Sequence, residues 1–87
     1  MRDNYNFSDN YIIIPAEELR ILQKKLYKKE RAIRLSNTSP YFDKQKVKTF
    51  TNEFFIYQDY LLNKYLKNTK YSFFEFDFIQ EKLFYYR

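Results

Sequence analysis

The sequence contains neither histidine nor cysteine. Histidine is the commonest general acid and base, and the two side chains together supply the usual ligands of zinc. Their absence excludes histidine-based catalysis, thiolate nucleophiles, thiolate metal sites and disulfide bonds. We therefore expect no metal and no cofactor.

Glycine is also absent. The loops that cradle phosphates, the dinucleotide-binding fingerprint and the strained turn that presents a nucleophilic serine all depend on glycine. Together with the missing histidine and cysteine, this absence predicts a binding protein that is not an enzyme and has no small-molecule substrate.

Long apolar runs are missing as well. No stretch approaches the roughly 20 apolar residues that span a bilayer. Residues 1–8 lack the apolar segment of a signal peptide. We expect a soluble, unprocessed protein of the cytoplasm or an organelle interior, neither secreted nor bound to a membrane.

Aromatic rings and positive charges are what the chain has in excess. Its 87 residues predict a single small domain, with residues 1–10 as a polar N-terminal arm. Ten phenylalanines and ten tyrosines are more than so small a core encloses, so some rings should lie at an interface. Sixteen lysines and arginines against eleven acidic residues give a net charge of +5, which favours polyanionic partners.

The composition offers a second explanation for the rings, because Asn, Lys, Tyr, Phe and Ile are the residues that an AT-rich genome encodes. In this respect the sequence resembles accessory proteins of AT-rich phages, mobile elements and organelles, including small inhibitors that block a host enzyme. The resemblance rests on composition alone and assigns no role to any residue.

A first helix is predicted from Pro15 to about Leu35. Pro15 suits the first helical position, and Glu17 and Glu18 follow where carboxylates stabilise the positive end of the helix dipole. Its apolar side chains form one narrow stripe that should face the core: Leu19, Leu22, Leu26 and Ile33. Before it, the β-branched run at 11–14 predicts either a short strand or an apolar strap.

The opposite face of this helix is basic. It carries five cations: Arg20, Lys24, Lys28, Arg31 and Arg34. Cations along one helix face can follow the phosphates of nucleic acid, and Tyr27 lies among them, where it could stack on an exposed base. We predict a nucleic-acid-binding site here, widened on one flank by Lys25 and Lys29. A helix face kept soluble by its charges explains the pattern equally well.

Residues 36–40 are the one cluster of turn-forming residues, so the chain should reverse there. A second helix is predicted from Pro40 or Asp43 to about Asn68. Its apolar residues recur at helical spacing: Val47, Phe50, Phe54, Tyr57 and Leu61. Residues 49–52 also offer a fresh cap, which would divide the segment into two helices.

The last segment fits two structures. Residues 74–78 alternate phenylalanine with carboxylates, as in a strand. Ser72 and Glu75 form a capping box, however, and four apolar residues keep helical spacing beyond it: Phe76, Ile79, Leu83 and Tyr86. We favour a helix for 73–79. The predicted fold is therefore all-α, a small three-helix assembly with an extended N-terminal arm.

Five apolar residues lie off the main stripes and are predicted to form a protein interface: Ile56, Tyr60, Phe74, Phe78 and Tyr85. A core wider than these stripes would account for them as well. We expect a protein partner or a homo-oligomer, with nucleic acid as a further partner.

Two catalytic alternatives are weaker. Glu75, Asp77 and Glu81, with Lys82 beside them, are the carboxylates that a magnesium-dependent nuclease would need, but solvated carboxylates between buried rings are the commoner case. Residues 85–87, Tyr-Tyr-Arg, are the one local match to a toxin-like ribonuclease that works without histidine. Such an enzyme needs a multistranded sheet, which the sequence does not predict.

The pattern as a whole predicts a non-catalytic protein: a small basic subunit or regulator of a nucleic-acid-handling assembly, contacting phosphates with its first helix and protein with aromatic faces. The alternative is a phage- or mobile-element-type inhibitor that acts purely by binding a host protein.

Overall fold

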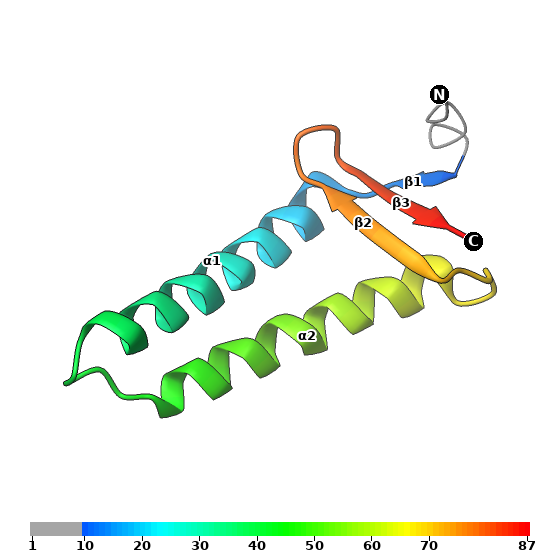
Figure 1. Ribbon diagram of the computed structural model, residues 1–87. Helices are drawn as coiled ribbons and strands as arrows, with labels where there is room; N and C mark the ends of the chain where they lie inside the picture. Colours follow the sequence, from blue (N-terminus) through cyan, green and yellow to red (C-terminus); the bar gives the residue numbers. More distant parts are fainter. Residues whose placement is uncertain (1–9) are drawn as a thin grey trace, which may run out of the picture.

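Two long helices and a small sheet make up the computed structural model, which describes residues 10–87. The chain order is β1 (Tyr11–Ile13), α1 (Ala16–Thr38), α2 (Gln45–Leu66), β2 (Phe73–Asp77) and β3 (Lys82–Tyr86). The helices run side by side in opposite directions, and the sheet lies where α1 begins and α2 ends (Figure 1). The fold is α+β, so the predicted all-α three-helix assembly is wrong.

The first two of the three predicted helices are present. The first runs three residues further than expected, to Thr38, and the second begins near Asp43 and continues through residues 49–52 without a break. Asp43 lies two residues before α2, and its Oδ1 accepts the backbone N–H of Gln45, the first helical residue, at 3.0 Å. The run before Pro15 forms a strand, which was one of its two predicted structures.

The three strands pair antiparallel in the order β1-β3-β2, so β3 is central. Tyr11 lies opposite Phe84 on one side of β3, and Glu75 lies opposite Phe84 on the other. Side chains alternate between the two faces of a strand. Leu83 therefore faces the helices, whereas Phe84 faces away from them.

The prediction of a helix at 73–79 is wrong. Residues 73–77 pair with β3 as a strand, and in a strand the alternating phenylalanines of this segment share one face. Phe74 and Phe76 pack against the core from one face of β2. Ser72 does not cap a helix: its hydroxyl donates to the carbonyl of Arg87 at 2.7 Å and so joins β2 to the end of β3. Asp77 then closes the turn by accepting the N–H groups of Ile79 and Gln80.

The core lies between the sheet and the helix ends next to it. One cluster joins the sheet to both helices and contains Ile14, Leu19, Leu62, Leu66 and Leu83. A second cluster lies further along the helices and contains Leu22, Phe54 and Leu61. The predicted stripe of α1 is only partly correct, since Ala32 is buried while Ile33 remains 39% exposed.

The helical hairpin extends well beyond the sheet (Figure 1). The radius of gyration is 15.5 Å, compared with about 12 Å for a compact domain of this length. Among the described residues, neither a strand nor a third helix therefore covers the half of the hairpin next to the α1–α2 loop. Side chains between these helices stay partly open to solvent.

Candidate functional site

The basic face of α1 comprises the six residues that were predicted to bind nucleic acid: Arg20, Lys24, Tyr27, Lys28, Arg31 and Arg34. All six are exposed. Arg20 and Arg34 lie about 21 Å apart along the helix axis, given a rise of about 1.5 Å per residue. The structure thus brings the whole predicted set together on one continuous surface.

Within residues 10–87, none of the five cations on this face forms an ion pair with a carboxylate. The ion pair found within residues 10–87 joins Lys64 to Glu18, and neither residue belongs to the basic face. The five cations of the face therefore keep their full charge toward solvent and toward any anionic partner. Tyr27, 63% exposed, lines a shallow hollow with Gln23, Lys24 and Lys28.

Lys25 and Lys29 do not widen the basic face, contrary to the prediction. Both are partly buried at the seam between the two helices. The Lys25 Nζ lies 5.9 Å from the centroid of the Tyr57 ring, and the Lys29 Nζ lies 5.3 Å from that of Phe54. Such cation–π contacts stabilise the helix pair, so these lysines serve packing.

A groove with a basic rim opens near the tip of the hairpin. Its volume is about 330 Å³, and it is lined by Lys28, Arg31, Ala32, Leu35, Phe42, Lys46 and Phe50. We call it the tip groove. Phe42 comes from the loop and Lys46 from the start of α2, so the groove exists only once the hairpin has formed. The groove was not predicted, because the periodicity of one helix carries no information about the helix that faces it.

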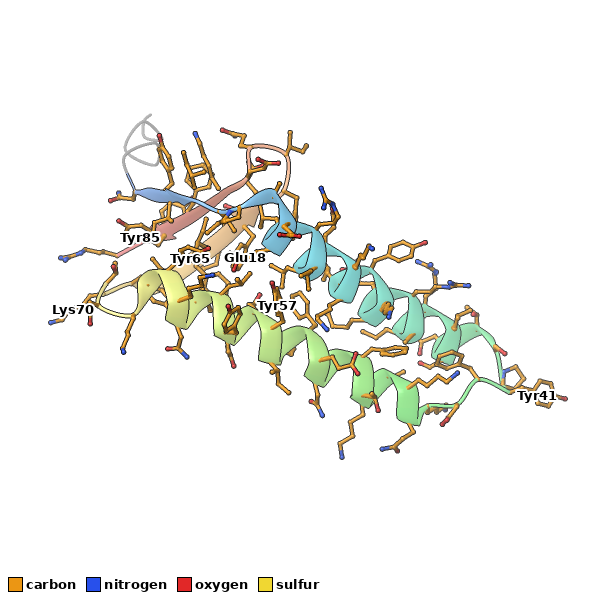
Figure 2. The ribbon with its side chains drawn as sticks, turned by 180° about the vertical axis from the view of Figure 1, so that it is seen from behind. Glu18, Tyr41, Tyr57, Tyr65, Lys70 and Tyr85 are labelled. Atoms are coloured by element: carbon orange, nitrogen blue, oxygen red, sulfur yellow. The ribbon has the colours of Figure 1, made fainter. Side chains whose placement is uncertain are left out.

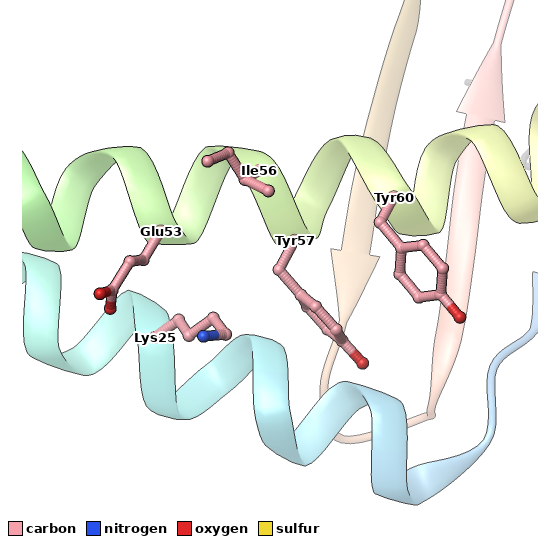
Figure 3. A pocket seen from close by; sticks show the side chains of 5 residues that line it. All are labelled: Lys25, Glu53, Ile56, Tyr57 and Tyr60. Carbon is pink, nitrogen blue, oxygen red and sulfur yellow. The ribbon is translucent and has the colours of Figure 1, made fainter.

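The predicted protein-interface residues are divided between two places. Ile56 and Tyr60 are exposed and line a groove of about 550 Å³ with Lys25, Glu53 and Tyr57. Tyr57 and Tyr60 reach from α2 toward α1 in this groove (Figure 3). Phe74, Phe78 and Tyr85 instead pack against the core. The structure therefore does not join the five residues into one surface.

Glu18 ties the beginning of α1 to the end of α2. Its carboxylate accepts a hydrogen bond from the Lys64 Nζ at 2.5 Å and another from the Tyr65 hydroxyl. Figure 2 shows Glu18 and Tyr65 next to each other between the helices. Burial opposes the charge of Glu18, but the two hydrogen bonds and the lysine charge outweigh it and lower the pKa of Glu18. Burial and the bond to Glu18 raise the pKa of Tyr65.

Because of Glu18, the free energy of unfolding should decrease as the pH is lowered. A carboxylate with a lowered pKa stabilises the folded state above its unfolded pKa, and this stabilisation is lost as the pH falls through the folded pKa. We expect Glu18→Gln to cost about 1–2 kcal/mol at neutral pH and to flatten the loss between about pH 6 and pH 3. Urea unfolding across this range measures both effects.

Glu17→Gln is the matched control, since Glu17 is an exposed carboxylate of the same helical turn without a hydrogen bond or ion pair in the described structure. A pH profile that Glu17→Gln flattens as much as Glu18→Gln does would contradict the assignment.

The carboxylates considered for a magnesium site do not converge. No group of three or more acidic side chains within residues 10–87 is arranged to hold a metal ion. Asp77 instead accepts three hydrogen bonds within its turn. The multistranded sheet that a toxin-like ribonuclease needs is present. Tyr85, however, packs on the core. Burial, together with the charge of Glu75 and a side-chain hydrogen bond to it, raises the pKa of Tyr86.

Comparison with known proteins provides no relative from which a function could be transferred: no family model, curated protein or solved structure matches the sequence. In the part of the chain that the structure describes, neither helix is long and apolar enough to cross a membrane.

Proposed function

We propose that this protein is a non-catalytic nucleic-acid-binding subunit or regulator, acting in the cytoplasm or an organelle interior, whose basic α1 face contacts phosphates. The observation that carries the proposal is the uninterrupted row of five exposed cations from Arg20 to Arg34, with no carboxylate paired to any of them in the described residues.

The density of charge on this face suits nucleic acid. Neighbouring cations three or four residues apart on a helix are about 5–6 Å apart, so the row presents about one positive charge per helical turn. Over about 21 Å of helix, five cations meet roughly the six phosphates that one strand of a duplex presents at 3.4 Å per nucleotide. Tyr27 adds a ring that can stack on an unpaired base.

A binding titration tests the proposal. Fluorescence anisotropy with a labelled RNA stem-loop should show binding at about 50 mM salt that weakens steeply as salt is added, because phosphate contacts release counterions. An absence of binding at this low salt concentration would rule the proposal out.

A second candidate function is binding to a protein, as an inhibitor or as an oligomer of this chain. It is favoured by the groove of about 550 Å³ in which Ile56 remains 69% exposed and Tyr60 50% exposed. Apolar side chains left in a hollow of this size suit a partner side chain. A pull-down with and without nuclease separates the two candidates, since only a nucleic-acid-mediated complex is lost on nuclease treatment.

A further inference from the structure

The tip groove combines an apolar floor with a rim of a single charge sign. Ala32 and Leu35 of α1 form the floor between two partly buried rings, Phe42 from the loop and Phe50 from α2. Three cations stand around them, namely Lys28, Arg31 and Lys46. None of the seven described lining residues is a carboxylate, so the groove suits an occupant that is apolar or flat in its body and anionic at its edge.

The rings present their faces to the rim. The Lys28 Nζ lies 5.8 Å from the centroid of the Phe50 ring, and the Lys46 Nζ lies 6.0 Å from that of Phe42. Lys28 and Lys46 are both exposed, so the group that covers each ring face is a solvent-exposed ammonium that can move aside. A planar base can take that place, while the displaced ammonium moves to the phosphate of the same nucleotide.

The tip groove continues the basic face of α1, because Lys28 and Arg31 belong to both. A nucleic-acid strand whose phosphates bind along α1 therefore reaches the tip groove. Bases inside a continuous duplex stay stacked and cannot enter, whereas bases in loops, bulges and single strands can splay out and stack on aromatic side chains.

We propose that the tip groove holds an unpaired base, so that the protein prefers looped or single-stranded nucleic acid to a continuous duplex. This inference rests on the proposed function and adds the class of nucleic acid that the site selects. A volume of about 330 Å³ lies at the lower end of small-molecule pockets, which suits one base.

The test compares two labelled RNAs with equal numbers of nucleotides, an adenine-loop stem-loop and a fully paired duplex. The wild-type protein should bind the stem-loop about tenfold more tightly, the effect expected from stacking one base. Phe42→Ala should reduce this preference to the part that Tyr27 stacking supplies and leave duplex binding unchanged, because Phe42 lies outside the basic face. Tyr41→Ala is the matched control, since Tyr41 is 95% exposed and projects from the tip of the hairpin (Figure 2).

A readout on the wild-type protein keeps the test independent of folding of the variant: addition of the stem-loop should shift the NMR ring signals of Phe42 and Phe50. Equal affinity for the two RNAs, or a preference that is as large in Phe42→Ala as in the wild-type protein, would overturn the inference while leaving the proposed function standing. A Glu- and Leu-rich peptide that binds in place of the loop, in a manner sensitive to Phe42→Ala, would also overturn it. Failure of both RNAs to bind would remove the proposed function itself.

Discussion

Replacing Leu83 with alanine should lower the free energy of unfolding by about 3 kcal/mol, which is the usual cost of a large cavity in a close-packed core. Leu83 is fully buried on the central strand β3 and belongs to the cluster with Ile14, Leu19 and Leu66. Because these neighbours come from the segment between β1 and α1 and from both helices, no single element can move to fill the space without disturbing the others.

A loss of this size is large for a domain that has no disulfide bond and a core divided between two small clusters. Urea or thermal unfolding followed by circular dichroism measures it. Ile79→Ala serves as control, because Ile79 lies in the β2–β3 turn and is 94% exposed, so its removal should change stability by less than about 0.5 kcal/mol. Equal effects of the two substitutions would show that the sheet does not pack on the helices as described.

The helices were predictable because their determinants lie within single segments. The apolar spacing of α2 and the turn residues at 36–40 each act over a few residues, and they indicated the approximate ends of these two helices. Strand β2 was mispredicted because its local pattern fits a strand or a helix. The choice is made by β3 and, through β3, by β1, which begins more than 60 residues earlier in the chain.

The candidate site was likewise predictable only where its residues lie on a single element. The basic face of α1 was predicted from the helical wheel, since all its residues lie on one element. The tip groove needs residues of α1, α2 and the loop between them, and the seam positions of Lys25 and Lys29 depend on the rings of α2. Phe74 was assigned to an interface because residues 73–79 were predicted as a helix. In strand β2 its side chain lies on the face that packs against the core.

Removing three cations from the basic face should weaken nucleic-acid binding far more than removing three from elsewhere. The proposed variant is Lys24→Gln, Arg31→Gln, Arg34→Gln, and the control replaces three other exposed lysines: Lys48, Lys67 and Lys70. Both substitutions lower the net charge from +5 to +2. Long-range attraction therefore falls to a similar extent in both, and the remaining difference reports on contact.

Counterion release sets the expected size of the effect. Five phosphate contacts to a duplex stem predict a wild-type affinity that falls about 500-fold between about 50 and 200 mM salt, and two remaining contacts predict a fall of roughly tenfold. The control variant should keep the steep wild-type slope, because none of its three lysines belongs to the basic face. If both variants lost affinity equally and shared one shallow slope, binding would depend on net charge alone, and α1 would be a solvated helix face without a phosphate-contacting role.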